Sequence, residues 1–133
     1  MLTHETARIE CVDVFYDGGY ASRFDHNIRT ALGERKVRKI AGRSQEVLRR
    51  LPLDHYDAIY VDGSHAAADV LEDAVLAFRL LKRGGVLIFD DYLWNTHLDP
   101  AVIPKPAIDA FLTIFQGHYE LMHVGYQVSL RRL

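Results

Sequence analysis

The chain has 133 residues, of which 49% are hydrophobic and 26% are charged, so we expect one compact soluble domain over residues 1–133. Its formal net charge of −2 gives no electrostatic attraction to nucleic acid or to an acidic membrane surface. The single cysteine excludes an internal disulfide framework, and no run of about 18 apolar residues is present, which together predict a cytoplasmic protein without a membrane partner.

The first part of the chain alternates strand-like and helix-like segments. A strand is expected at 8–15, a helix at 24–32, a second strand at 36–42 and a short helix at 45–51. Ser44 stands where a helix cap is favoured, and Pro52 ends the short helix because it cannot continue the hydrogen-bond pattern.

The second part continues this alternation. Strands are expected at 57–62 and 85–91, helices at 65–82 and 107–115, and two closing strands at 119–125 and 126–132. The helix at 65–82 has the clearest apolar stripe, and Gly84-Gly85 is expected to end it. Lys82 and Arg83 would then lie at its carboxyl end, where the helix dipole favours cations.

Strands that alternate with helices, followed by a closing pair of strands, predict a doubly wound, Rossmann-like α/β sheet. Ligands gather at the carboxyl ends of the strands in such sheets. Four acidic residues follow predicted strands at that edge: Asp13, Asp62, Asp90 and Asp91.

Asp62, Asp90 and Asp91 follow two strands that we expect to be neighbours. Three carboxylates at one edge repel one another unless a cation lies between them, and Mg²⁺ prefers oxygen ligands. The alternative is that each acid is a helix cap or a solvated loop residue. We favour a magnesium site.

His65 opens the long helix, three residues after Asp62. It is either an ordinary polar residue of the first helical turn or a general base that removes a proton from a hydroxyl near neutral pH. Tyr92 and Trp94, just after the acid pair, are expected either to form a wall against the substrate or to anchor the loop.

Asp13 and Ser44 each have two interpretations. An acid at the end of the first strand accepts hydrogen bonds from ribose hydroxyls in nucleoside sites of this architecture, but it is equally an ordinary turn residue before Gly18-Gly19. Ser44 is first of all a helix cap, and a position near an adenine ring is the second interpretation.

The segment "YDAIYVDGSHAAADVLEDAVLAFRLLKRGGVLIFDDYLW" (56–94) resembles class I S-adenosylmethionine-dependent methyltransferases. It is similar above all to the metal-dependent O-methyltransferases typified by macrocin O-methyltransferase. The resemblance implies methyl transfer to a hydroxyl of a small molecule, with S-adenosylmethionine and Mg²⁺ as cofactors. The implied roles are metal ligation by Asp62, Asp90 and Asp91, proton abstraction by His65, and cofactor binding by Asp13, Gly42, Ser44 and Asp62.

One family feature is missing from the sequence. Such enzymes carry a glycine-rich Glu/Asp-x-Gly-x-Gly turn after their first strand, and no Gly-x-Gly occurs here. We therefore expect the chain to begin at the family's second strand and to bind the cofactor weakly or not at all. A central strand edge without a partner readily recruits another chain, which predicts a homodimer. The alternative function is an inactive remnant that acts as a binding or self-associating module.

Overall fold

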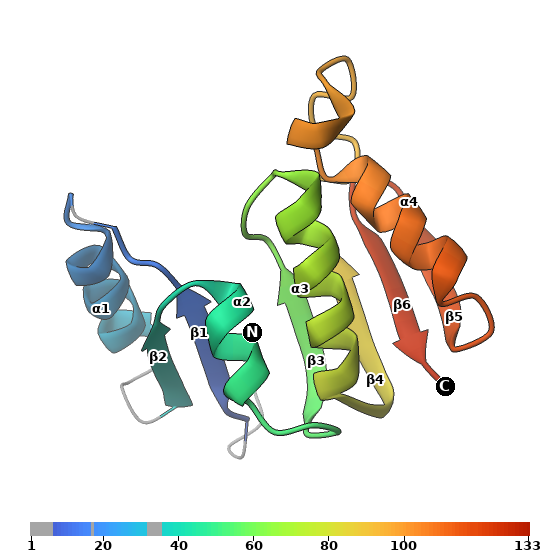
Figure 1. The fold of residues 1–133 in the computed structure, drawn as a ribbon. Helices are drawn as coiled ribbons and strands as arrows, with labels where there is room; N and C mark the ends of the chain where they lie inside the picture. Colours follow the sequence, from blue (N-terminus) through green and yellow to red (C-terminus); the bar gives the residue numbers. More distant parts are fainter. Residues whose placement is uncertain (1–6, 17, 32–35) are drawn as a thin grey trace. The chain divides into compact units, whose positions relative to one another are not determined.

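A computed structural model describes residues 7–16, 18–31 and 36–133 of the chain (Figure 1). The chain divides into two compact units, residues 1–47 and residues 48–133. Each unit is described by itself below.

The first unit is a parallel strand–helix–strand arrangement. Strand β1 (Ile9–Asp13) leads through helix α1 (Tyr20–Ala31) to strand β2 (Val37–Ala41), and a single turn of helix, α2 (Ser44–Val47), follows. The two strands pair in parallel, from Ile9 opposite Val37 to Asp13 opposite Ala41. Both predicted strands and the predicted helix are thus confirmed, and the predicted helix end at residues 32–33 lies outside the described residues.

The second unit contains a four-stranded mixed sheet. Its elements are the 3-10 turn η2 (Leu48–Arg50), β3 (Tyr56–Val61), α3 (Ala67–Leu80), β4 (Leu81–Phe89), the 3-10 turn η3 (Pro100–Val102), α4 (Lys105–Ile114), β5 (Tyr119–Val124) and β6 (Val128–Arg132). The strand order is β3-β4-β6-β5. Strands β3 and β4 are parallel, whereas β6 runs antiparallel to both of its neighbours, β4 and β5. Helices α3 and α4 lie side by side on one face of this sheet (Figure 1).

The core of the second unit lies between that face and the two helices. Phe111 of α4 is fully buried, and its ring contacts the rings of Phe78, Phe89 and Phe115. Aliphatic residues of the central strands and the helices complete this core: Ala74, Ala77, Leu81, Leu87, Ile108, Val128 and Leu130. Burial of this apolar surface fixes which face of each strand points inward, and with it the register in which the strands pair. The register in turn fixes which residues lie at the carboxyl edge of the sheet.

The junction between α3 and β4 differs from the prediction. The helix ends at Leu80 and the strand begins at once with Leu81, so Gly84 and Gly85 belong to the strand instead of ending the helix. The side chain of Leu81 is fully buried, and Leu81 is paired with Tyr56 in the ladder. The placement of Lys82 and Arg83 at the helix end was therefore wrong, because burial of Leu81 outweighs the helical periodicity that continues through it.

The predicted α/β class is confirmed. Parallel strand pairs connected through helices and an antiparallel closing pair are the arrangement of a Rossmann-like sheet. None of the helices in the described ranges has the length and apolar character needed to cross a membrane.

Candidate active site

The candidate site lies at the carboxyl ends of β3 and β4. Asp62 follows β3 directly, and Asp90 and Asp91 follow β4. The Asp90 N–H donates to the Val61 carbonyl at 3.0 Å, which extends the parallel pairing by one step and brings the two strand ends together. A small pocket opens there, lined by Val61, Asp62, Gly63, Ser64, His65, Val70, Phe89, Asp90, Asp91 and Pro104. The four residues predicted for metal binding and proton transfer therefore share one pocket.

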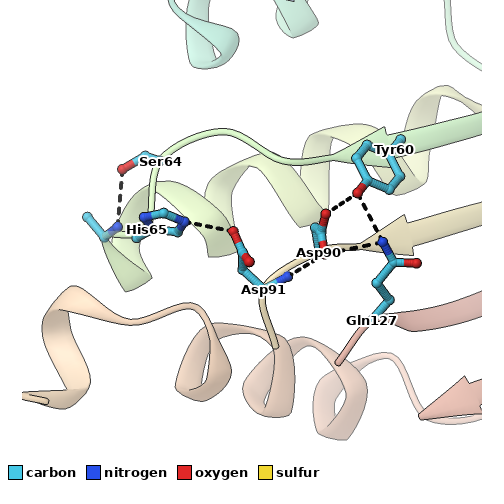
Figure 2. Close-up of polar contacts among 7 residues, drawn as sticks. Tyr60, Ser64, His65, Asp90, Asp91 and Gln127 are labelled. Carbon is cyan, nitrogen blue, oxygen red and sulfur yellow. Dashed lines mark hydrogen bonds and ion pairs between the residues drawn. The ribbon is translucent and has the colours of Figure 1, made fainter. Parts of the chain in front are cut away.

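His65 is held by Asp91 and Trp94. Figure 2 shows the contact between the His65 ring and the Asp91 carboxylate. In this contact, Nε2 and Oδ2 are 2.8 Å apart. The His65 ring also stacks on Trp94, with centroids 4.1 Å apart and an interplanar angle of 14°. The side chain of His65 remains 38% exposed. When Nε2 carries the ring proton it donates a hydrogen bond to Asp91 Oδ2, and Nδ1 is then the ring nitrogen that can accept a proton from another group.

Asp91 adopts a conformation that is uncommon for a residue with a side chain. Its φ of +57° lies in the left-handed region. Its N–H donates to Asp90 Oδ1 at 2.8 Å, and its carbonyl accepts from Trp94 N–H at 2.9 Å. This tight turn directs the Asp91 carboxylate toward His65, and strained backbone of this kind is concentrated at functional sites.

Asp90 is bound by two residues that the sequence did not single out. The Tyr60 hydroxyl donates to Asp90 Oδ2, and the Gln127 amide donates to Asp90 Oδ1 at 3.2 Å and to the Tyr60 hydroxyl at 3.0 Å (Figure 2). The hydrogen bond to Asp90 raises the pKa of Tyr60 to about 12, and the same bond is the main reason that the pKa of Asp90 is lowered. Tyr60 resembles an ordinary strand residue and Gln127 a turn residue, so no sequence signal distinguished them.

The pKa of Asp62 is raised, partly because two other acidic residues lie nearby. Burial raises its pKa, and the charges of Asp90 and Asp91 raise it further, while His65 acts in the opposite direction. This mutual repulsion is what a cation would relieve, and carboxylate oxygens are the ligands that Mg²⁺ prefers. Within the described ranges, however, no three acidic, histidine or cysteine side chains converge in the manner of a metal site. Asp90 and Asp91 instead bind Tyr60, Gln127 and His65, so the donor chemistry fits Mg²⁺, but these contacts would have to adjust for all three acids to ligate one ion.

Tyr92 and Trp94 differ in their surroundings, although the sequence placed them together. Trp94 packs on the His65 ring, whereas the Tyr92 hydroxyl turns to α4 and donates to Asp109 Oδ1 at 2.7 Å. Lys105 Nζ lies 2.9 Å from the same hydroxyl and 2.6 Å from Asp109 Oδ2. The hydrogen bond to Asp109 is the main cause of the raised pKa of Lys105. Neither aromatic residue lines the acidic pocket.

The residues predicted to bind the cofactor's nucleoside part lie in the first unit. Gly42 N–H donates to the Asp13 carbonyl at 3.0 Å, so the ends of β1 and β2 bring these two residues together. The Asp13 carboxylate accepts a hydrogen bond from Phe15 N–H at 2.9 Å, as a turn residue would. Gly42 has a φ of +154°, and a Cβ there would lie 2.9 Å from Val47 Cγ2, so the chain turns closely into α2, whose first residue is Ser44.

Comparisons with known proteins relate this arrangement to methyltransferases. A family model described as a methyltransferase domain matches residues 1–92. A putative O-methyltransferase of Mycobacterium sp. (strain JLS) is 39% identical over 61 residues, which are 46% of this chain and 27% of the relative. The match therefore spans about a quarter of the length of that curated relative.

Solved structures share the fold at low sequence identity. The O-methyltransferase from Bacillus cereus in complex with SAH has a TM-score of 0.71 at 17% identity, over 94% of this chain and 63% of the other. An O-methyltransferase from Streptomyces achromogenes involved in tomaymycin synthesis, in complex with SAM, has a TM-score of 0.75 at 15% identity, over 98% of this chain and 64% of the other. The chain is similar to both in fold.

Proposed function

Because the chain belongs to the methyltransferase domain family, we propose that it is an S-adenosylmethionine-dependent O-methyltransferase domain that methylates a hydroxyl group of a small molecule. One observation supports this proposal above all. Asp62, His65, Asp90 and Asp91 line a single pocket at the carboxyl ends of neighbouring parallel strands, where α/β sheets bind their ligands.

The proposed roles follow from the contacts of these residues. His65 Nε2–H donates a hydrogen bond to Asp91 Oδ2, which leaves Nδ1 unprotonated to take the proton of the acceptor hydroxyl. When bound, S-adenosylmethionine supplies the methyl group on its sulfonium, and its release as S-adenosylhomocysteine accompanies formation of the new oxygen–methyl bond. Trp94 would hold the imidazole plane and border the acceptor.

Asp62, Asp90 and Asp91 are the residues that we propose for Mg²⁺. The ion would lower the pKa of the acceptor hydroxyl and orient it, and it would offset the repulsion that raises the pKa of Asp62. Asp13, Gly42 and Ser44 are proposed to contact the ribose and adenine of the cofactor, since Asp13 and Gly42 meet at the ends of their strands. A cytoplasmic location and a homodimer remain part of the proposal.

A thermal-shift titration tests the binding part of this proposal. S-adenosylmethionine, added up to millimolar concentration with and without Mg²⁺, should raise the melting temperature by mass action, and more so when Mg²⁺ is present. Asp62→Asn should remove the part of the rise in melting temperature that depends on Mg²⁺. Asp57→Asn is the matched control, because Asp57 is an exposed acid of β3, the strand that Asp62 follows, and it pairs with Lys82 at 2.7 Å and does not line the pocket. An equal magnesium effect in Asp62→Asn and wild type would contradict the metal assignment.

A further inference from the structure

We propose that Lys105 and Asp109 of α4 are positioning residues for His65, acting through Tyr92 and the backbone of Asp91. The catalytic consequence rests on the proposed function, whereas the positioning itself is a property of the structure that is measurable without any activity.

The first step is a three-membered cluster in which Tyr92 contacts Lys105 and Asp109 of α4. The Tyr92 hydroxyl donates to Asp109 Oδ1 at 2.7 Å, and Lys105 Nζ donates to that hydroxyl at 2.9 Å and to Asp109 Oδ2 at 2.6 Å. Lys105 Nζ also lies 4.6 Å from the centroid of the Tyr92 ring, close enough for a cation–π contact. Each member therefore contacts both of the others, and Tyr92 is fixed at the end of its side chain.

The second step is the link from Tyr92 to the site. Tyr92 directly follows Asp91, and its N–H donates to the Tyr126 carbonyl at 2.9 Å. Tyr92 is thus held by its hydroxyl and by its main chain, and it also packs against the hydrophobic core. A left-handed conformation such as that of Asp91, with a φ of +57°, persists only where the neighbouring structure holds it.

The third step connects Asp91 to the base. Asp91 Oδ2 is the hydrogen-bond partner of His65 Nε2, and the same imidazole stacks on Trp94. If Tyr92 loses its anchor on α4, the Asp91 turn relaxes and its carboxylate moves away from His65. The imidazole then loses its orientation relative to Trp94.

Tyr92→Phe is the direct test, because it removes only the hydroxyl and keeps the ring in the core. Tyr119→Phe is the matched control: its hydroxyl also binds α4, at the Leu112 carbonyl (2.9 Å), and its ring packs against the same core. Trp94 is the chain's single tryptophan, so its fluorescence and near-ultraviolet circular dichroism report on the His65 stack.

We expect both variants to fold and to lose some thermal stability, but only Tyr92→Phe should change the Trp94 signals. Asp109→Asn should give the same change. Where methyl transfer is measurable, Tyr92→Phe should lower kcat by about 10-fold or more with KM for S-adenosylmethionine unchanged, because a displaced base affects the chemical step.

Trp94 signals in Tyr92→Phe that match those of Tyr119→Phe would overturn the proposal. A change in Tyr92→Phe that is missing in Asp109→Asn would overturn the part assigned to Asp109. Absence of methyl transfer in the wild type would count against the proposed function and would leave the spectroscopic result unaffected.

Discussion

The contacts of Asp90 show how single residues tune the site. The Tyr60 hydroxyl can donate to the Asp90 carboxylate only while it is protonated, so this hydrogen bond favours neutral Tyr60 and ionised Asp90. Because the pKa of Tyr60 is raised, this hydrogen bond stabilises the folded state fully at pH values below 10.0, the ordinary pKa of tyrosine. The stabilisation is lost as the pH rises through about 12. Because the pKa of Asp90 is lowered, its contribution is present above 3.8 and is lost as the pH falls below that value.

A titration of Tyr60 tests this coupling. In Asp90→Asn, the pKa of Tyr60 should fall toward its ordinary value, since the charged acceptor that favours the protonated hydroxyl is gone. The ring signals of Tyr60, followed by nuclear magnetic resonance as the pH is raised, measure this, and Asp57→Asn serves as a control at the other end of β3. An unchanged pKa of Tyr60 in Asp90→Asn would show that the hydrogen bond does not cause the shift.

The predictability of the site from sequence also differs from residue to residue. Asp62, His65 and the acid pair were predicted to meet because they follow parallel strands, and they line one pocket. Tyr60 and Gln127 were missed because they meet only in the folded chain. Their side chains form a hydrogen bond although 67 positions separate them in the sequence. The direction of the Tyr92 side chain, toward α4 rather than the pocket, depends on packing that no local pattern encodes.

At the scale of elements, the α3–β4 junction shows where periodicity misleads. The apolar stripe of α3 continues in register through Leu81, but Leu81 pairs with Tyr56 and begins the strand. Gly85 makes this possible, since a Cβ there would lie 2.9 Å from the Lys82 carbonyl oxygen and 3.1 Å from that of Tyr56. Gly84, its neighbour, has a φ of +81° and open space around the position of a Cβ. The other elements were predictable because their apolar patterns and their burial agree.

These adjacent glycines provide a matched pair of substitutions. Gly84→Ala should cost about 1–2 kcal/mol of unfolding free energy, because a side chain is strained in the left-handed region. Gly85→Ala should cost more, up to about 3 kcal/mol, because two main-chain oxygens must move and the β3–β4 pairing is disturbed. Urea denaturation of both variants measures the difference. An equal or smaller loss in Gly85→Ala would show that the junction absorbs the extra methyl group.

At the scale of the whole molecule, the α/β class could be predicted because alternating strands and helices leave few arrangements of a sheet. Within the described residues, β1 pairs with β2 in the first unit and β3 pairs with β4 in the second. Pairing between sequence-distant strands depends on global packing, which is why the sequence left it open.

We propose that the chain associates with a second copy of itself through the edge strand β3. Within the described residues of the second unit, β3 has β4 as its single strand partner, and unpaired backbone groups of a sheet edge favour another strand. Sedimentation equilibrium over a range of concentrations should show a homodimer, with β3 amides that become more protected from hydrogen exchange as the dimer forms. A monomer at every concentration would contradict this proposal.

The central claim is that His65, oriented by Asp91, serves methyl transfer to a hydroxyl, and a methyl-transfer assay tests it most directly. Transfer of labelled methyl from S-adenosylmethionine to a panel of phenolic and sugar hydroxyl acceptors, with Mg²⁺ present, should be detectable in the wild type. His65→Ala should lower the rate by about 10²–10⁴-fold, the usual contribution of a positioned base. His55 is an exposed histidine of the same unit that does not line the pocket, so His55→Ala should keep the wild-type rate of methyl transfer. No transfer to any acceptor, or an undiminished rate in His65→Ala, would contradict the account.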